Sequence, residues 1–108
     1  MIDNNILLKE SLEAFSNFIV VNAIGEVTYI NRVYARLLGI NQKDAIGKRV
    51  DKIIPNTRML NVLKTGVPEI GAVMNFFDHE HNKDVTLICN RYPVIYENKV
   101  IGAVAMTT

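Results

Sequence analysis

The sequence has little of what would point to a disulfide framework or a nucleic-acid target. Its single cysteine, Cys89, excludes an intramolecular disulfide, and the apolar strand-like run around it indicates a small buried side chain rather than a reactive thiol. Charge of one sign is not in excess, because twelve basic residues are offset by eleven acidic ones. With no block of like charge, the sequence predicts no direct contact with DNA or RNA.

Long hydrophobic runs are missing as well. The longest, residues 18–21 and 100–106, are far shorter than the about 20 residues of a membrane-spanning helix. Asp3, Asn4 and Asn5 stand where a secretory signal would carry positive charge. We therefore predict a cytoplasmic protein that makes no membrane contact.

Recognisable catalytic motifs are also scarce. No serine or cysteine has a histidine partner at a familiar spacing, and no Gly-x-Ser-x-Gly sequence occurs. His79 and His81 flank Glu80 and could supply metal ligands, but a solvated polar loop explains them better. The sequence predicts neither an enzyme nor a metal site.

What is present is enough apolar material for one folded domain, since 49% of the 108 residues are hydrophobic. Leu8, Leu12 and Phe15 recur at helical spacing, which predicts an amphipathic helix over residues 5–15. Because this helix precedes the main pattern, we divide the chain into a leading helix, residues 1–16, and a domain, residues 17–108. The three apolar side chains are the candidate dimer interface.

The first half of the domain contains strong turn and cap signals. Two strand-like runs, residues 18–21 and 26–30, predict a β-hairpin. Asn31 then suits the N-cap of a helix that stops at Gly39. Two further short pieces are expected, one that begins at Asn41 with Asp44 in its first turn and closes at Gly47, and one over residues 50–54.

The second half is one helix followed by strands. Asn56 is the expected N-cap of a helix over residues 57–65, which Gly66 and Pro68 end. Three strands should follow, at residues 69–77, 84–96 and 99–107. The order predicts an α+β fold, with a mainly antiparallel five-stranded sheet and short helices on one face.

Several stretches resemble the PAS family of sensor domains, over about residue 15 to the C-terminus. They are Ile19-Val20-Val21-Asn22, Val27-Thr28-Tyr29-Ile30-Asn31, Leu38-Gly39-Ile40, Ala45-Ile46-Gly47-Lys48 and Gly102-Ala103-Val104. Three more, Pro55-Asn56-Thr57-Arg58, Lys64-Thr65-Gly66 and Asn90-Arg91-Tyr92-Pro93, are similar to PAS domains of sigma-54-dependent transcriptional activators. The resemblance implies a regulatory domain that controls effector domains outside this chain, which has no phosphate loop and no basic recognition helix.

The resemblance leaves the cofactor unknown but argues against two of the family's cofactors. Haem would need an axial histidine in residues 57–65, and none is there. Covalent flavin chemistry of the LOV type would need a cysteine where this chain has Thr57, between Asn56 and Arg58.

The resemblance also implies a ligand cavity between the sheet and the helices. Arg58 could bind an anion or a carboxylate beside a helix terminus, or it could be an ordinary surface arginine. Asn90 and Arg91 point to opposite faces of their strand, and Asn90 is the better pocket candidate if Thr86 and Ile88 share its face. The candidate ligand-binding residues are Tyr34, Leu38, Arg58, Met59, Leu63, Ile88, Asn90 and Met106, although core packing would explain most of them.

Two functions follow from this reading. In the first, a small ligand in the cavity shifts the domain between two packings and so biases an attached effector. In the second, the domain is a ligand-free structural module that forms a homodimer through its leading helix. An enzyme is the least favoured class, because the candidate pocket has no titratable group except Arg58 at its rim.

Overall fold

The computed structural model describes residues 1–107. Its elements run in the order α1 (Asn4–Glu13), β1 (Asn17–Asn22), β2 (Val27–Ile30), α2 (Arg32–Leu38), α3 (Gln42–Ala45), α4 (Val50–Ile53), α5 (Met59–Thr65), β3 (Glu69–Asp78), β4 (Lys83–Tyr96) and β5 (Lys99–Thr107). The strands form one sheet in the order β2-β1-β5-β4-β3, and every neighbouring pair is antiparallel. The predicted α+β architecture is confirmed.

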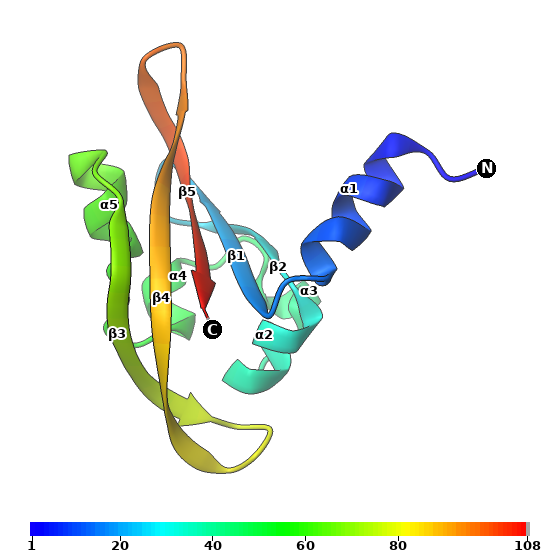
Figure 1. Ribbon diagram of the computed structural model, residues 1–108, viewed down its shortest axis with the longest axis vertical. Helices are drawn as coiled ribbons and strands as arrows, with labels where there is room; N and C mark the ends of the chain where they lie inside the picture. The colour runs from blue at the N-terminus through cyan, green and yellow to red at the C-terminus, as the bar shows by residue number, and fades with distance from the viewer. Residues whose placement is uncertain (108) are drawn as a thin grey trace.

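The first and the last strand lie side by side in the middle of this sheet, with helices α2 to α5 on one face (Figure 1). Helix α1 projects away from the rest of the molecule, and none of its residues is buried. No helix within residues 1–107 is both long and apolar enough to cross a membrane.

The local signals around α2 act as expected. Asn31 has extended backbone, and its side-chain oxygen accepts the Tyr34 N–H at 3.2 Å, which caps the helix. Gly39 ends α2 in the left-handed conformation. At the turn between β4 and β5, Glu97 and Asn98 both have positive φ, as a two-residue hairpin of this hand requires.

Several helix boundaries differ from the predictions. Helix α1 ends at Glu13, so Phe15 lies outside it. Helix α5 begins at Met59 because Asn56 adopts φ +59°, a left-handed conformation outside any helix, so Asn56 is not its cap. Asn41 precedes α3 but donates its amide to Asp44 instead of accepting a backbone N–H. Helix α3 ends at Ala45, two residues before Gly47.

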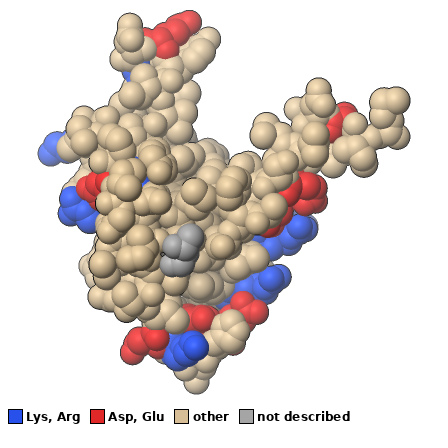
Figure 2. Space-filling view, viewed as in Figure 1, with Lys and Arg blue, Asp and Glu red and all other residues tan. Residues whose placement is uncertain are grey.

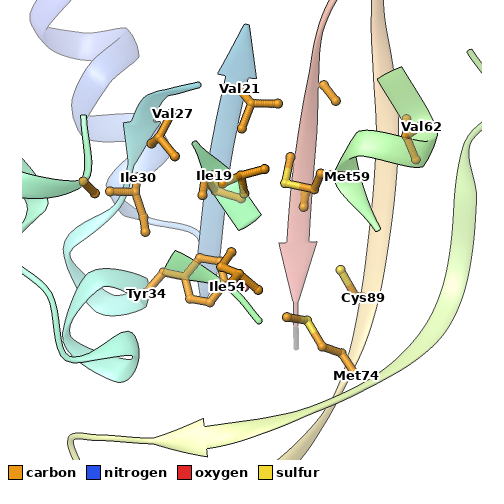
Figure 3. Close-up of a cluster of buried hydrophobic side chains, with 14 of the residues drawn as sticks. Ile19, Val21, Val27, Ile30, Tyr34, Ile54, Met59, Val62, Met74 and Cys89 are labelled. Atoms are coloured by element: carbon orange, nitrogen blue, oxygen red, sulfur yellow. The ribbon is translucent and has the colours of Figure 1, made fainter. Parts of the chain in front are cut away.

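The core fills the space between the sheet and helices α2 to α5. Side chains from both layers converge there (Figure 3), among them Ile19, Val21, Val27, Ile30, Tyr34, Ile54, Met59, Val62, Met74 and Cys89. All of these except Met74 are at most 1% exposed. Burial raises the pKa of the Cys89 thiol, so this cysteine is a core residue without thiolate character.

Candidate functional site

The structure buries the opposite face of β4 from the one that was predicted to line the cavity. Cys89 and Arg91 point toward the helices and are buried, whereas Ile88 lies on the other face and is 46% exposed. Asn90 and Met106 are cross-strand partners on that same other face, where the Asn90 oxygen accepts the Gly71 N–H at 2.7 Å. Ile88, Asn90 and Met106 therefore do not line a cavity between the sheet and the helices.

The remaining apolar candidates belong to the packed interior or to its edge. Tyr34 and Met59 are each 1% exposed, and the Tyr34 ring packs edge-on against Phe76 at a centroid distance of 6.4 Å. Leu38 and Leu63 are partly buried against the same core. Burial raises the pKa of the Tyr34 phenol, which stays neutral. Tyr34 and Met59 pack the core, whereas Leu38 and Leu63 also line separate surface hollows of about 280 and 260 Å³.

Arg58 lies in an ion-pair cluster that sequence reasoning missed. Its guanidinium donates to the Glu69 carboxylate at 2.8 and 3.0 Å, and the Arg91 Nη1 donates to the same carboxylate at 3.1 Å. Hydrogen bonds from Arg58, reinforced by the charges of both arginines, hold the pKa of Glu69 below its usual range. Arg58 is the N-cap residue of α5, as expected for a position beside a helix terminus, but its side chain pairs with Glu69 of β3 instead of capping the helix.

A hollow of about 220 Å³ opens beside this cluster, at the free edge of β3. Arg58, Arg91 and the connection between α4 and α5 all line it. Its lining residues are Pro55, Asn56, Arg58, Val73, Met74, Asn75 and Arg91. Of these, only Arg58 was among the predicted site residues. The sequence could have pointed to Arg91, because Asn90 and Arg91 are adjacent in a strand and one of the two must face the helices.

A second polar cluster attaches α1 to the domain, and we call it the Glu13 cluster. The Glu13 carboxylate accepts hydrogen bonds from the Tyr29 hydroxyl, from the Arg32 N–H at 2.8 Å and from the Gln42 amide at 3.0 Å. Burial alone would raise the pKa of Glu13, but these three donors lower it. The cluster holds the C-terminal end of α1.

The three predicted dimer residues lie on both sides of Glu13 in the sequence, Leu8 and Leu12 before it and Phe15 after it. Leu8 is 64% exposed and Phe15 is 43% exposed, whereas Leu12 is half-buried. The Phe15 ring stacks on Phe18 of β1 at a centroid distance of 5.4 Å. Apolar surface therefore continues from α1 onto the sheet.

We call the sheet face that points away from helices α2 to α5 the outer face. Its apolar side chains are Phe18, Val20, Ile88, Tyr92, Val104 and Met106. In the view of Figure 2, Lys, Arg, Asp and Glu lie around the margin of the molecule and the centre is free of them. The outer face and α1 together present apolar surface that no described part of the chain covers.

The two histidines belong to the β3–β4 turn. Asp78 accepts the N–H groups of Glu80 and His81 at 2.9 Å each, and its other oxygen contacts the His81 ring at 2.8 Å. Within residues 1–107, no group of three or more histidine, cysteine or acidic side chains is arranged to hold a metal. These hydrogen bonds show that Asp78 and His81 stabilise the β3–β4 turn.

Comparison with curated proteins finds two sensor proteins of Halalkalibacterium halodurans. This chain is 27% identical over 89 residues to the sensor protein CitS and, over the same length, to a probable C4-dicarboxylate sensor kinase. The matches cover 81% and 82% of this chain but only 15% of each relative's length. No sigma-54-dependent activator is among these relatives, so the predicted resemblance to that subfamily lacks support.

Solved structures share the fold at low sequence identity. A VqmA dimer of Vibrio cholerae, described as a LuxR-type receptor, superposes with a TM-score of 0.77 at 13% identity, over 99% of this chain and 51% of that one. A PAS domain from Colwellia psychrerythraea superposes with a TM-score of 0.69 at 17% identity, over 94% of this chain and 95% of that one. A family model described as the PAS fold matches residues 12–105. From the topology and this match together, we conclude that the chain belongs to the PAS family of sensor domains.

Proposed function

We propose that this PAS domain is a non-catalytic input module of a larger signalling protein, and that it acts as a homodimer through α1 and the outer face. The observation that carries the proposal is the arrangement of α1. Its last turn is held by the Glu13 cluster, while Leu8 and other apolar side chains farther along α1 stay exposed. A helix held at one end is suited to pass a change in the domain to whatever it contacts.

Apolar continuity supports a second copy of the chain as the occupant of this surface. Phe15 and Phe18 join α1 to the outer face, where Ile88 and Met106 lie. Exposed apolar surface of this extent, bordered by charge, is typical of interaction sites. A two-fold dimer would cover α1 and the outer face of both copies with the same residues.

The oligomeric state tests this proposal directly. We expect light scattering to give a dimer for the unchanged chain, and Leu8→Glu to weaken the dimer at least roughly tenfold, because each copy would lose a buried leucine and place a charge in the interface. Val67→Glu is the matched control, since Val67 is also exposed but lies between α5 and β3. A monomer at high concentration, or a dimer that Leu8→Glu leaves unchanged, would contradict the proposal.

The attached effector is the second part of the proposal. Sensor kinases are the curated relatives, and one of them is named for C4-dicarboxylates, which supports a kinase effector and a small acid as the stimulus. One VqmA structure is described as a complex with ligand and DNA, but this chain covers only 51% of that protein. This neighbour counts against the expected absence of nucleic-acid contact, which rests only on the balanced charge of the chain.

The alternative is a structural dimerisation module without a ligand. It shares the dimer with the first function and differs only in lacking a response to a small molecule. A thermal-shift screen of metabolites separates the two, because a ligand that binds the folded state raises the unfolding temperature by mass action. A dimer with no stabilising compound would favour the structural module.

A further inference from the structure

Arg91 is a charged side chain placed inside the domain. Its side chain is only 4% exposed, and it extends from the helix-facing side of β4. Burial of a guanidinium is costly unless it is paired and hydrogen-bonded. Its carboxylate partner, Glu69, is shared with Arg58, so two positive groups meet one negative group. The surroundings of the hollow therefore have a local charge of +1.

Most hydrogen-bonding capacity of Arg91 is unused. A guanidinium has five N–H donors, and within residues 1–107 the one hydrogen bond it makes is from Nη1 to Glu69 at 3.1 Å. The same guanidinium lines the hollow at the edge of β3. A buried guanidinium that lines a hollow and makes one hydrogen bond can bind a further acceptor there.

The other walls restrict what that acceptor can be. Pro55 and Met74 supply apolar surface, and Asn56 adds a neutral amide. Val73 and Asn75 border the hollow from the edge strand with their side chains on the outer face, paired with Ile88 and Thr86. A volume of about 220 Å³ is below the roughly 300–1,000 Å³ of pockets for drug-sized ligands. The walls therefore suit a short hydrocarbon chain with an anionic end group.

We infer that this hollow binds a small organic carboxylate, with the carboxylate on Arg91 and the hydrocarbon against Pro55 and Met74. The flat fork of a guanidinium matches the two oxygens of a carboxylate. Inorganic phosphate would have the charge but would leave the apolar walls without a partner. This inference rests on the sensor role proposed above and adds the ligand class and the residue that recognises it.

The hollow lies between two parts of the fold, so a ligand bound there would contact both. Arg91 belongs to β4, while Pro55 and Asn56 belong to the connection between α4 and α5. A bound carboxylate would therefore contact both the sheet and the helical layer. Binding would favour whichever packing of these two layers brings them together at the hollow.

Titration of the ¹⁵N-labelled chain, followed by NMR, tests the site without any substitution. The probes are butyrate, succinate and inorganic phosphate at matched ionic strength. We expect the two carboxylates to cause saturable shifts at the Arg91 Nε–H and at the side-chain amide of Asn56. No saturable shift up to about 10 mM, shifts located elsewhere, or equal shifts with phosphate would each overturn the inference.

Substitutions then test the role of the guanidinium. Arg91→Gln should weaken binding of the carboxylate that shifts the spectrum roughly 10- to 100-fold, since a hydrogen bond to a charged group is lost. Arg36→Gln is the control, because Arg36 is exposed and pairs with Glu80 instead. Equal weakening by both variants would overturn the inference. If Arg91→Gln does not fold, the shift of the Arg91 Nε–H in the unchanged chain decides.

This outcome is independent of the proposed dimer. If the chain forms a dimer but binds no carboxylate, the inferred ligand class is wrong and the proposed dimeric input module stands. Conversely, a monomer that binds butyrate or succinate at Arg91 would keep the site and contradict the dimer.

Discussion

At the residue scale, Asn31 links three segments of the chain. It is 0% exposed, and its side-chain oxygen accepts the N–H groups of Phe18 at 3.1 Å and Tyr34 at 3.2 Å. Its amide donates to the Phe15 carbonyl at 2.9 Å. One side chain therefore caps α2 and also connects β1 and the end of α1.

We expect Asn31→Ala to lower the free energy of unfolding by about 2–4 kcal/mol, because it removes a helix cap and leaves buried backbone groups without partners. Urea denaturation measures this change. Asn41→Ala is a matched control at another helix start, where the side chain makes no capping hydrogen bond. A loss at Asn31 no larger than the loss at Asn41 would show that the cap is unimportant.

At the element scale, α1 depends on the Glu13 cluster for its position. Burial raises the pKa of the Tyr29 phenol, because a phenolate there would be poorly solvated. The Glu13 carboxylate raises this pKa further, because a phenolate would face its negative charge. Since the pKa is raised in the folded state, the associated stability is complete below about pH 10 and is lost as the pH rises further. Alkaline pH should therefore release α1.

Glu13→Gln should bring the pKa of Tyr29 part of the way back toward its ordinary value, since burial remains while the negative charge is gone. Absorbance titration of the tyrosines measures this shift, and hydrogen exchange over residues 4–13 should become faster. Asp51→Asn is the control, because Asp51 pairs with Arg49 at the surface and does not affect Tyr29. An unchanged Tyr29 titration in Glu13→Gln would refute the cluster's role.

At the scale of the whole molecule, β5 completes the sheet. It pairs with β1 on one side and with β4 on the other, so the last residues of the chain join the first strand to the β3–β4 pair. Ala103 and Ala105 of β5 also belong to the core. The sheet is therefore not continuous until β5 is in place.

Removal of residues 99–108 should abolish cooperative unfolding, because β1 and β4 would both lose their partner in the centre of the sheet. Circular dichroism during urea denaturation would show a broad, shallow change. Removal of residues 2–8 is the control, since α1 buries no residue, and it should leave a sharp transition. A sharp transition after loss of residues 99–108 would contradict this account.

The sequence by itself determined the local structure. Asn31 and Gly39 delimit α2, and the Glu97-Asn98 turn joins β4 to β5, because caps and tight turns depend on a few adjacent residues. The five strands and the PAS family followed from such signals. Asn41 and Asn56 were exceptions among the expected caps; Asn56 failed because an asparagine suits a helix cap and a left-handed turn equally well.

Only the tertiary structure decided which face of β4 is buried. Both alternating sets of β4 contain apolar residues, so periodicity alone does not choose between Ile88 with Asn90 and Cys89 with Arg91. The preference for Asn90 followed from the expectation that it shares the helix-facing side with Thr86 and Ile88. Arg91 is buried because Glu69, distant in sequence, pairs with it across β3 and β4. A contact between distant residues, which no local pattern encodes, placed the candidate site.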